Sequence, residues 1–404
     1  MNIARFKSLP IEFYVLVLPF TLWMLWALFS AYDVFTLAGG VKGVSRHIYY
    51  NFFSLFFFLI GFFFVVRYTA QLVFAVLGKY VNDFAAPQNK EGQKTGYRSE
   101  SLLACARTAQ LLLPYVAYLY VLVSGVFIIA WLYASAEFDA VRMYSMFYTD
   151  LDIRLFGEGV YARVIALFDS SWALSQFITW SYLGLSVVLG VTALILAMTS
   201  CRLFREFMLG FFLIIPASIP LWATISAVSP SQYLREGEVG EVAPEHQAIA
   251  HLTQNAVTSA RPEYKEAIAT LERMWEQSEG ANSFAVSTNP SMHVAWGFLC
   301  VVYAFMVHRA LGMVLVVYQL ANMIGTVFLL QHYTIDAPLG VALMALVILV
   351  ARGLIAYEER YMTVNQTWWF AGVILIREEV GKHVRILVAD ISRMWRLCIA
   401  RMSR

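Results

Sequence analysis

Long apolar runs dominate the chain and alternate with shorter polar segments. A membrane-spanning helix needs about 20 largely apolar residues. Eight runs meet this requirement, at approximately 11–31, 51–76, 109–134, 173–198, 205–228, 293–308, 311–331 and 335–357. The pattern therefore predicts an all-α polytopic membrane protein. The first run is too long and too aromatic for a signal peptide, so we interpret it as an anchor.

Polar segments divide the chain into four parts. The stretch AAPQNKEGQKTGYRSES within 85–108 has the composition of a flexible linker. The predicted domains are an N-terminal two-span membrane region (1–84), a cytoplasmic linker (85–108), a six-span catalytic domain (109–357) and a basic amphipathic tail (358–404). The tail is expected to lie on the anionic cytoplasmic leaflet.

The longest polar interruption, residues 229–292, lies inside the six-span domain and is expected to be partly helical. Pro262 opens a predicted helix, because proline is favoured in a first helical turn. One face of that helix is apolar and consists of Tyr264, Ile268, Leu271 and Trp275. The helix either forms a lid over the bilayer surface or packs on its own loop, and the pattern fits both arrangements.

Composition and charge place the protein in the membrane and orient it. The chain is 60% hydrophobic and only 14% charged, whereas a soluble domain carries about 25% charged residues. Lysine and arginine gather near the N-terminus, in 77–108, at the Arg202/Arg205 turn and in the tail, while 229–292 is acidic. Loops rich in lysine and arginine are retained in the cytoplasm, so both termini are expected there, and the loops 135–172 and 229–292 are expected outside. The net charge of +2 gives no indication of nucleic-acid binding.

Cysteines and nucleotide motifs give no sign of a cofactor. The four cysteines are scattered through the chain, without the spacing of a disulfide framework or a metal site, and they are Cys105, Cys201, Cys300 and Cys398. The sequence contains no zinc-protease, P-loop or dinucleotide motif. We therefore predict neither a metal nor an organic cofactor.

Two short motifs, PSMH at 290–293 and HYTID at 332–336, each lie at the edge of an apolar run. Two predicted spans separate them, so the chain crosses the membrane and returns, and His293 and His332 reach the same outer face. Ionisable groups at membrane depth are expensive and are functional candidates. Asp336 follows His332 by four residues and can orient its imidazole from the same helix face.

The alternative is that each histidine only caps a helix, which we would favour for a single histidine but not for a pair with a matched aspartate. The remaining histidines have no such support. We expect the loop residues His246 and His251 at the surface, and the others in loops or at boundaries, namely His47, His308 and His383.

This constellation suits a two-step phosphoryl transfer that needs no metal. His332 attacks phosphorus as the activated nucleophile and forms a phosphohistidine. His293 donates a proton to the departing oxygen and then serves as the base for the incoming hydroxyl. Ser291 and the amides around it are placed to bind a phosphate oxygen at the start of a helix.

PSMH followed by HYTID resembles the type 2 phosphatidic acid phosphatase superfamily, whose usual signatures are K-x6-R-P, P-S-G-H and S-R-x5-H-x3-D. The likeness covers roughly 109–357. It implies a six-helix bundle with the site between helices at the outer surface, to which the spans 11–31 and 51–76 are additions.

The departures from these signatures indicate a branch of the superfamily. Met292 replaces the usual glycine, Gly325 and Thr326 stand where Ser-Arg is expected, and the lysine motif is missing. Such cations clamp a phosphate monoester, and a diester with one charge fewer needs them less. The motifs are similar to those of inositol-phosphoceramide and sphingomyelin synthases, and this resemblance implies that His293, His332 and Asp336 form the catalytic triad.

The head group of the substrate requires further contacts. The predicted substrate-binding residues are Ser291, Tyr333, Tyr233 and Arg235. Arg235 is singled out because it closely follows the proline-containing turn at 229–233. Other cationic candidates are Arg142, Arg154 and Arg163.

The predicted function is an integral-membrane lipid phosphotransferase that moves a phospho-head group from a donor phospholipid to an acceptor alcohol, either a lipid or a polyol. The alternative is a lipid phosphate or polyprenyl diphosphate phosphatase, in which water is the acceptor. A transporter or an inactive relative is a third possibility, against which the intact triad and the lack of paired broken helices argue. The sequence leaves the oligomeric state open.

Overall fold

The computed structural model describes residues 11–29, 120, 121, 124, 128, 137–236, 240–276 and 289–361. Every regular element within these residues is a helix. Three helices are long and apolar enough to cross a membrane, and one bent pair adds a fourth candidate. This confirms a helical multi-pass membrane protein. The predicted span 51–76 and most of 109–134 lie outside the described residues, so the six-helix bundle stays a prediction.

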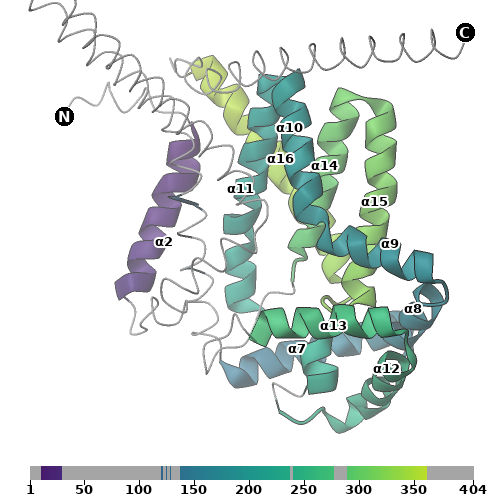
Figure 1. Cartoon of the computed structure of the whole chain (residues 1–404). Coiled ribbons are helices and arrows are strands. Elements are labelled where there is room, and N and C mark those ends of the chain that lie inside the picture. Colours follow the sequence, from purple (N-terminus) through teal and green to yellow (C-terminus); the bar gives the residue numbers. More distant parts are fainter. Residues whose placement is uncertain are drawn as a thin grey trace, which may run out of the picture.

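Five helices stand side by side and form the bundle (Figure 1). They are α10 (Leu185–Thr199), α11 (Cys201–Thr224), α14 (Met292–Val307), α15 (Arg309–Phe328) and α16 (Asp336–Tyr361). The central helix is α14, which packs against all four of the others. At 16 residues it is shorter than a straight span usually needs. The predicted tight turn near residue 308 is confirmed, because His308 caps α15 by accepting a hydrogen bond from the Ala310 amide.

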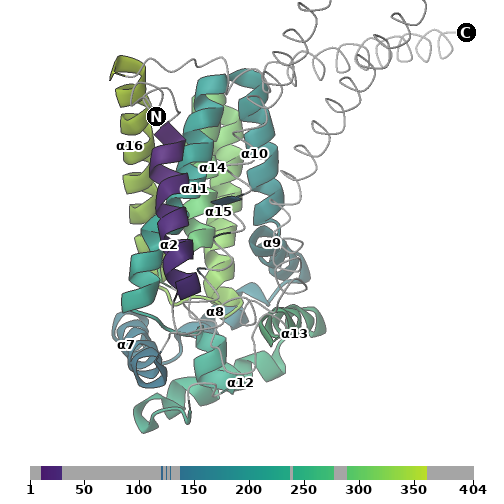
Figure 2. The same cartoon turned by 90° about the vertical axis from the view of Figure 1, so that its left-hand side faces the viewer.

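A further apolar helix, α2 (Leu18–Phe29), stands beside the bundle and continues from the π-helical turn η1 (Phe13–Val17) (Figure 2). An ion cluster ties its start to the bundle. Arg205 of α11 binds Glu12 through Nε at 2.5 Å and Glu358 of α16 through Nη1 at 2.8 Å. Arg205 is only 3% exposed, so this residue of the Arg202/Arg205 turn is buried in an ion cluster, and the cytoplasmic position of the turn stays a prediction.

A second group of helices lies across one end of the bundle (Figures 1 and 2). It consists of α7 (Phe138–Phe156), α8 (Val160–Phe168), α9 (Trp172–Leu183), α12 (Gln247–Ser259) and α13 (Pro262–Glu276). The first two occupy the segment 135–172, which we expected to be a loop. The buried face of α7 is mostly polar, so the search for apolar runs did not find this helix. Its buried residues are Val141, Ser145, Tyr148, Thr149 and Asp152.

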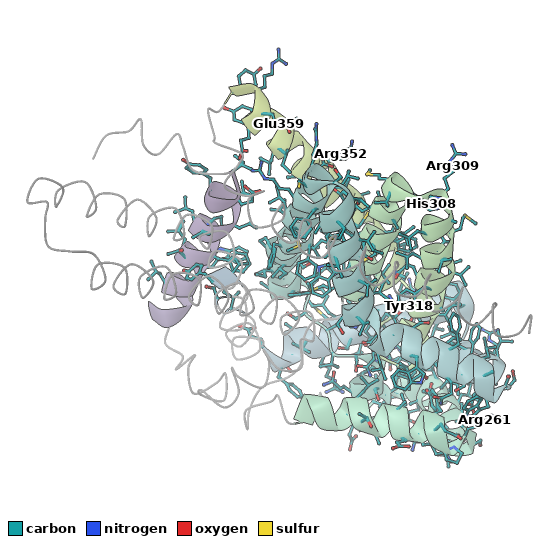
Figure 3. The ribbon with its side chains drawn as sticks, turned by 45° about the horizontal axis from the view of Figure 1, so that its top comes forward. Arg261, His308, Arg309, Tyr318, Arg352 and Glu359 are labelled. Atoms are coloured by element: carbon teal, nitrogen blue, oxygen red, sulfur yellow. The ribbon has the colours of Figure 1, made fainter. Side chains whose placement is uncertain are left out.

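The predicted span 173–198 is not one straight helix. It is divided into α9 and α10, whose axes differ by 62°. Gly184 stands at the break, where a Cβ would lie 2.7 Å from the Trp180 carbonyl oxygen, so the close approach requires glycine. Tyr318 of α15, labelled in Figure 3, donates to the Ser181 carbonyl at 2.5 Å and holds the end of α9.

The helix predicted to open at Pro262 is confirmed as α13. Its apolar residues Tyr264, Ile268 and Leu271 are buried, whereas the side chain of Trp275 lies outside the description. The helix packs against α9 and against α12 of its own loop, and the Tyr264 hydroxyl donates to the Phe328 carbonyl at 2.7 Å. It therefore packs within its own loop and also contacts the end of α15, and its role as a lid over the bilayer surface stays a prediction.

Candidate active site

The two motif histidines meet at the end of the bundle that the second group of helices covers. His293 lies in the first turn of α14, which Ser291 caps by accepting a hydrogen bond from the Val294 amide at 3.4 Å. His332 lies in the turn between α15 and α16. The ring centroids of the two imidazoles are 6.0 Å apart and the planes are inclined by 63°. A phosphoryl group placed between them would be within reach of both rings.

Asp336 holds His332 from the first residue of α16. Its Oδ2 lies 3.2 Å from His332 Nδ1 and also accepts the Tyr333 amide at 3.1 Å. We expected His332 on the face of the last helix, but it precedes that helix. The contact over four residues persists because the turn folds His332 back, with its amide donating to the Thr326 carbonyl at 3.1 Å. Pro338 falls in the first turn of α16, where proline is favoured.

A close approach of α14 and α16 brings the two motifs together. The Ser291 amide donates to the Asp336 carbonyl at 3.3 Å. A Cβ at residue 340 would lie 2.6 Å from the Ser291 carbonyl oxygen. Gly340 is therefore required for the PSMH segment to lie against the start of α16.

His293 has partners that the sequence reasoning did not identify. Its ring stacks on Tyr182 of α9 with centroids 4.2 Å apart, and its carbonyl accepts from Asn322 Nδ2 of α15 at 3.1 Å. Asn322 also donates to Gln319, which in turn donates to the Val294 carbonyl. Polar residues inside the apolar run 311–331 were a usable signal for the amide pair. Nothing in the sequence pattern indicates Tyr182.

Tyr333 is buried between the second group of helices and the start of α16. Its ring lies 5.4 Å from that of Tyr148 on α7. Burial raises the pKa of the Tyr333 hydroxyl well above its usual value, so the phenol stays protonated at physiological pH. It is a packing residue of the turn, and its predicted contact with substrate stays a prediction.

Tyr233 and His246 form a buried pair in the segment between α11 and α12. The Tyr233 hydroxyl lies 2.8 Å from His246 Nδ1, and His246 Nε2 lies 2.9 Å from Asp150 of α7. His246 is 0% exposed, so its predicted surface position is wrong. It precedes α12 and its ring turns inward, whereas His251 is exposed as expected. The described hydrogen bond of the Tyr233 hydroxyl is therefore with His246, and its predicted contact with substrate stays a prediction.

Arg235, the head-group candidate, is engaged by other side chains. It forms an ion pair with Glu272 of α13 and donates to Gln254 of α12 at 3.1 Å. Two further candidates, Arg142 and Arg163, donate to the backbone carbonyls of Glu241 and Phe156. The described contacts of these three guanidinium groups are therefore with other residues of the protein.

Thr326 stands where the resemblance expects the phosphate-binding arginine. It is buried, and its hydroxyl donates to the Met323 carbonyl at 2.7 Å. Its own carbonyl accepts the amides of Gln331 and His332. This position closes the turn that carries His332.

Asp152 of α7 is another residue that the sequence reasoning missed. Its carboxylate accepts hydrogen bonds from both the amide and the hydroxyl of Thr334, inside the HYTID motif. It was not considered because it lies in a segment expected to be a loop, far from either motif in sequence. The residues around the histidine pair therefore come from α7, α9, α14, α15 and α16.

Apolar helices of spanning length, with two histidines and an aspartate brought together at one end, fit a membrane enzyme that uses a histidine nucleophile. The chain belongs to the PAP2 superfamily, whose family model matches residues 149–350, half of the chain. Members of this superfamily are metal-independent phosphatases or phosphotransferases. The matched region runs from α7 into α16 and contains both motifs. Comparison with curated proteins and comparison with solved structures each found no match.

Proposed function

We propose that the protein is a lipid phosphotransferase that moves a phosphorylated head group from a donor phospholipid to an acceptor alcohol through His332. The observation that carries this proposal is the paired geometry of His332 and Asp336, 3.2 Å apart, with the His293 ring 6.0 Å from that of His332. The proposal goes beyond superfamily membership, which covers phosphatases and phosphotransferases alike.

In the first step, His332 attacks the phosphorus of the donor phosphodiester. Since Asp336 binds Nδ1, we assign the attack to Nε2. A nitrogen–phosphorus bond forms, the bond from phosphorus to the lipid oxygen breaks, and His293 gives its proton to the departing alkoxide. The products are a neutral lipid alcohol and a phosphohistidine that carries the head group.

In the second step, the acceptor hydroxyl attacks the phosphohistidine. His293, now neutral, takes the hydroxyl proton as the new oxygen–phosphorus bond forms and the nitrogen–phosphorus bond breaks. His332 is released, His293 is again protonated, and a new phosphodiester leaves the site. Charge and protons balance over the two steps without a metal or a redox partner.

The contacts of Thr326 and the arginines support a diester over a monoester. A monoester dianion requires more positive charge than a diester monoanion. The arginine expected in the third motif is replaced by the buried Thr326, and Arg235 is paired with Glu272. We therefore place the protein with enzymes resembling inositol-phosphoceramide and sphingomyelin synthases. The phosphatase alternative is kept as an outcome of the experiment below.

We also propose that the site faces the extracytoplasmic side and that both termini are cytoplasmic. Arg309 begins α15, whereas His332 follows the other end of that helix. Arg309 therefore lies at the end of the bundle away from the motif histidines, and Figure 3 shows Arg352 toward the same end. The helices of the acidic 229–292 segment gather at the opposite end, near the motifs. Basic residues are retained in the cytoplasm, which supports this orientation.

The experiment uses the purified full-length protein in lipid vesicles with phospholipid labelled at phosphorus, with and without lipid or polyol alcohols. A new labelled phosphodiester that forms only when an alcohol is added supports the transferase. Inorganic phosphate released from a labelled monoester lipid, with no transfer product, favours the phosphatase. A labelled protein adduct that disappears in His332→Ala identifies the covalent intermediate, and its formation unchanged in that variant would exclude His332.

A further inference from the structure

The turn that carries His332 has an unfavourable backbone. Leu330 has a φ of 56°, in the left-handed region, where a non-glycine residue loses roughly 1 kcal/mol. The Thr326 carbonyl accepts the amides of both Gln331 and His332. Such a conformation persists only where the surroundings hold it in place.

Segments outside the bundle hold the turn on the side that precedes His332. The Tyr264 hydroxyl of α13 donates to the Phe328 carbonyl at 2.7 Å. The Ser231 amide, in the segment after α11, donates to the Leu330 carbonyl at 3.0 Å. These contacts fix the backbone before His332 but leave the residues between His332 and Asp336 to be held by something else.

Asp152 supplies that second support. Its Oδ2 accepts the Thr334 amide at 3.2 Å and the Tyr161 hydroxyl at 2.6 Å, and its Oδ1 accepts the Thr334 hydroxyl. All three contacts are described with the carboxylate as acceptor, which is the role of an ionised Asp. Asp152 is 0% exposed, and a carboxylate is buried in this way only when its oxygens are well satisfied.

We propose that Asp152 is a positioning residue for His332, a role that rests on the proposed function of His332 as nucleophile. By holding Thr334 at both its amide and its hydroxyl, Asp152 fixes the chain midway between His332 and Asp336. A shift of Thr334 changes the separation of Nδ1 and Oδ2, now 3.2 Å, and with it the direction in which the imidazole faces phosphorus. Misplacement by about 1 Å lowers catalytic rates on the order of 100-fold.

The first test compares Asp152→Asn with wild-type protein in the vesicle assay. Asparagine keeps the shape but directs an amide NH₂ group at a donor of Thr334 or Tyr161. We expect kcat to fall about 10- to 100-fold with KM nearly unchanged, because positioning acts on the reacting atoms and not on lipid binding. The matched control is Asp139→Asn, which removes an exposed carboxylate from the same helix and is expected to leave kcat unchanged.

Variants of Thr334 separate positioning from a general structural role. Thr334→Val removes the hydroxyl donor and is expected to lower kcat, whereas Thr334→Ser retains the donor and restores it. In the double variant Asp152→Asn/Thr334→Val, the losses should be strongly non-additive, because both substitutions break the same contact. Additive losses, or a rise in KM with kcat unchanged, would overturn the proposal.

Hydrogen exchange tests the contact independently of catalysis. The Thr334 amide is expected to exchange at least 10-fold faster in Asp152→Asn than in wild type or Asp139→Asn, while the amides of α14 keep their protection. Unchanged exchange at Thr334 would contradict the positioning role. If exchange changes but wild-type protein forms no phosphohistidine, the contact is real and the proposed function is what fails.

Discussion

The two ends of the bundle both bury carboxylates, but they satisfy them differently. At the end away from the histidines, Arg205 binds Glu12 and Glu358 through four nitrogen–oxygen contacts of 2.5–2.8 Å. At the histidine end, Asp336 is bound by the His332 ring and a backbone amide, and Asp152 by one phenol and by Thr334. The contacts described for these aspartates involve no lysine or arginine.

This difference separates a structural ion cluster from the proposed catalytic cluster. A guanidinium held by two carboxylates is strongly fixed, and removing it leaves buried charge uncompensated. An arginine bound to Asp336 would compete with His332 for the carboxylate. Within the described residues, Asp336 Oδ1 is buried without a hydrogen-bond partner, which is unfavourable for stability. The histidine end therefore gives up stability to keep His332 oriented, and the other end supports the fold.

The largest expected effect is at the histidine end. His332→Ala removes the proposed nucleophile and should lower transfer activity by at least about 10³-fold, with the thermal unfolding midpoint close to that of wild type. His251→Ala, an exposed histidine of α12, is the control and should retain full activity. Activity of His332→Ala within tenfold of wild type would remove the functional difference between the two ends.

Asp336→Asn should separate activity from stability. The amide cannot stabilise the imidazolium that forms when His332 reacts, so activity is expected to fall on the order of 10²- to 10³-fold. The midpoint should stay the same or rise, because a buried carboxylate with one unpartnered oxygen is replaced by a neutral group. Kinetics and thermal unfolding of one preparation measure both. A midpoint that falls sharply would show that Asp336 supports the fold as Arg205 does.

Arg205→Met should produce the opposite result. Removing one partner of a buried ion pair typically destabilises a protein by about 3–5 kcal/mol, so the unfolding midpoint should fall markedly. The activity of the remaining folded enzyme should be unchanged, since the cluster lies at the other end of the bundle. Arg352→Gln is the control, because Arg352 is 52% exposed and 3.5 Å from Glu206, and it should have little effect. Loss of activity per folded molecule in Arg205→Met would show that the two ends are coupled.

The sequence predicts the meeting of His293 and His332 because it depends on span length alone. Two helices joined at His308 return the chain to the same face. The contact between Asp336 and His332 was predicted from a shared helix face, whereas the turn before α16 produces it. The apolar helix face with Tyr264 is likewise a local pattern. The return of the chain to one face and the apolar face of α13 follow from helix length and periodicity, which can be seen in the sequence alone.

The missed features depend on contacts between segments that are distant in sequence. An apolar run does not indicate whether its helix is straight or bent. The 62° bend between α9 and α10, and the contact of Tyr182 with His293, could therefore not be predicted from hydrophobicity. Glu12, Arg205 and Glu358 each look like a boundary residue until three helices are placed together. Asp152 is one of several aspartates in α7, and only its burial against Thr334 distinguishes it.

The smallest expected effect concerns how Asp152 responds to pH. Burial raises the pKa of its carboxyl above the usual value, and hydrogen bonds from Thr334 and Tyr161 oppose that rise only in part. The native state therefore binds this proton more tightly than the unfolded state does, and the contribution of Asp152 to stability falls as pH rises. Asp152→Asn does not titrate at this position. The midpoint of wild type minus that of Asp152→Asn should be greatest below the usual carboxyl pKa of about 4.

That difference should then decrease with rising pH and become constant above the native pKa of Asp152. Thermal unfolding of both proteins in one detergent across this range measures it, with Asp139→Asn as the control that should follow wild type. A difference that grows with pH would mean that the hydrogen bonds outweigh burial at Asp152. Asp152 would then belong with the structural cluster, and its contact with Thr334 would stabilise the fold first and orient His332 only as a consequence.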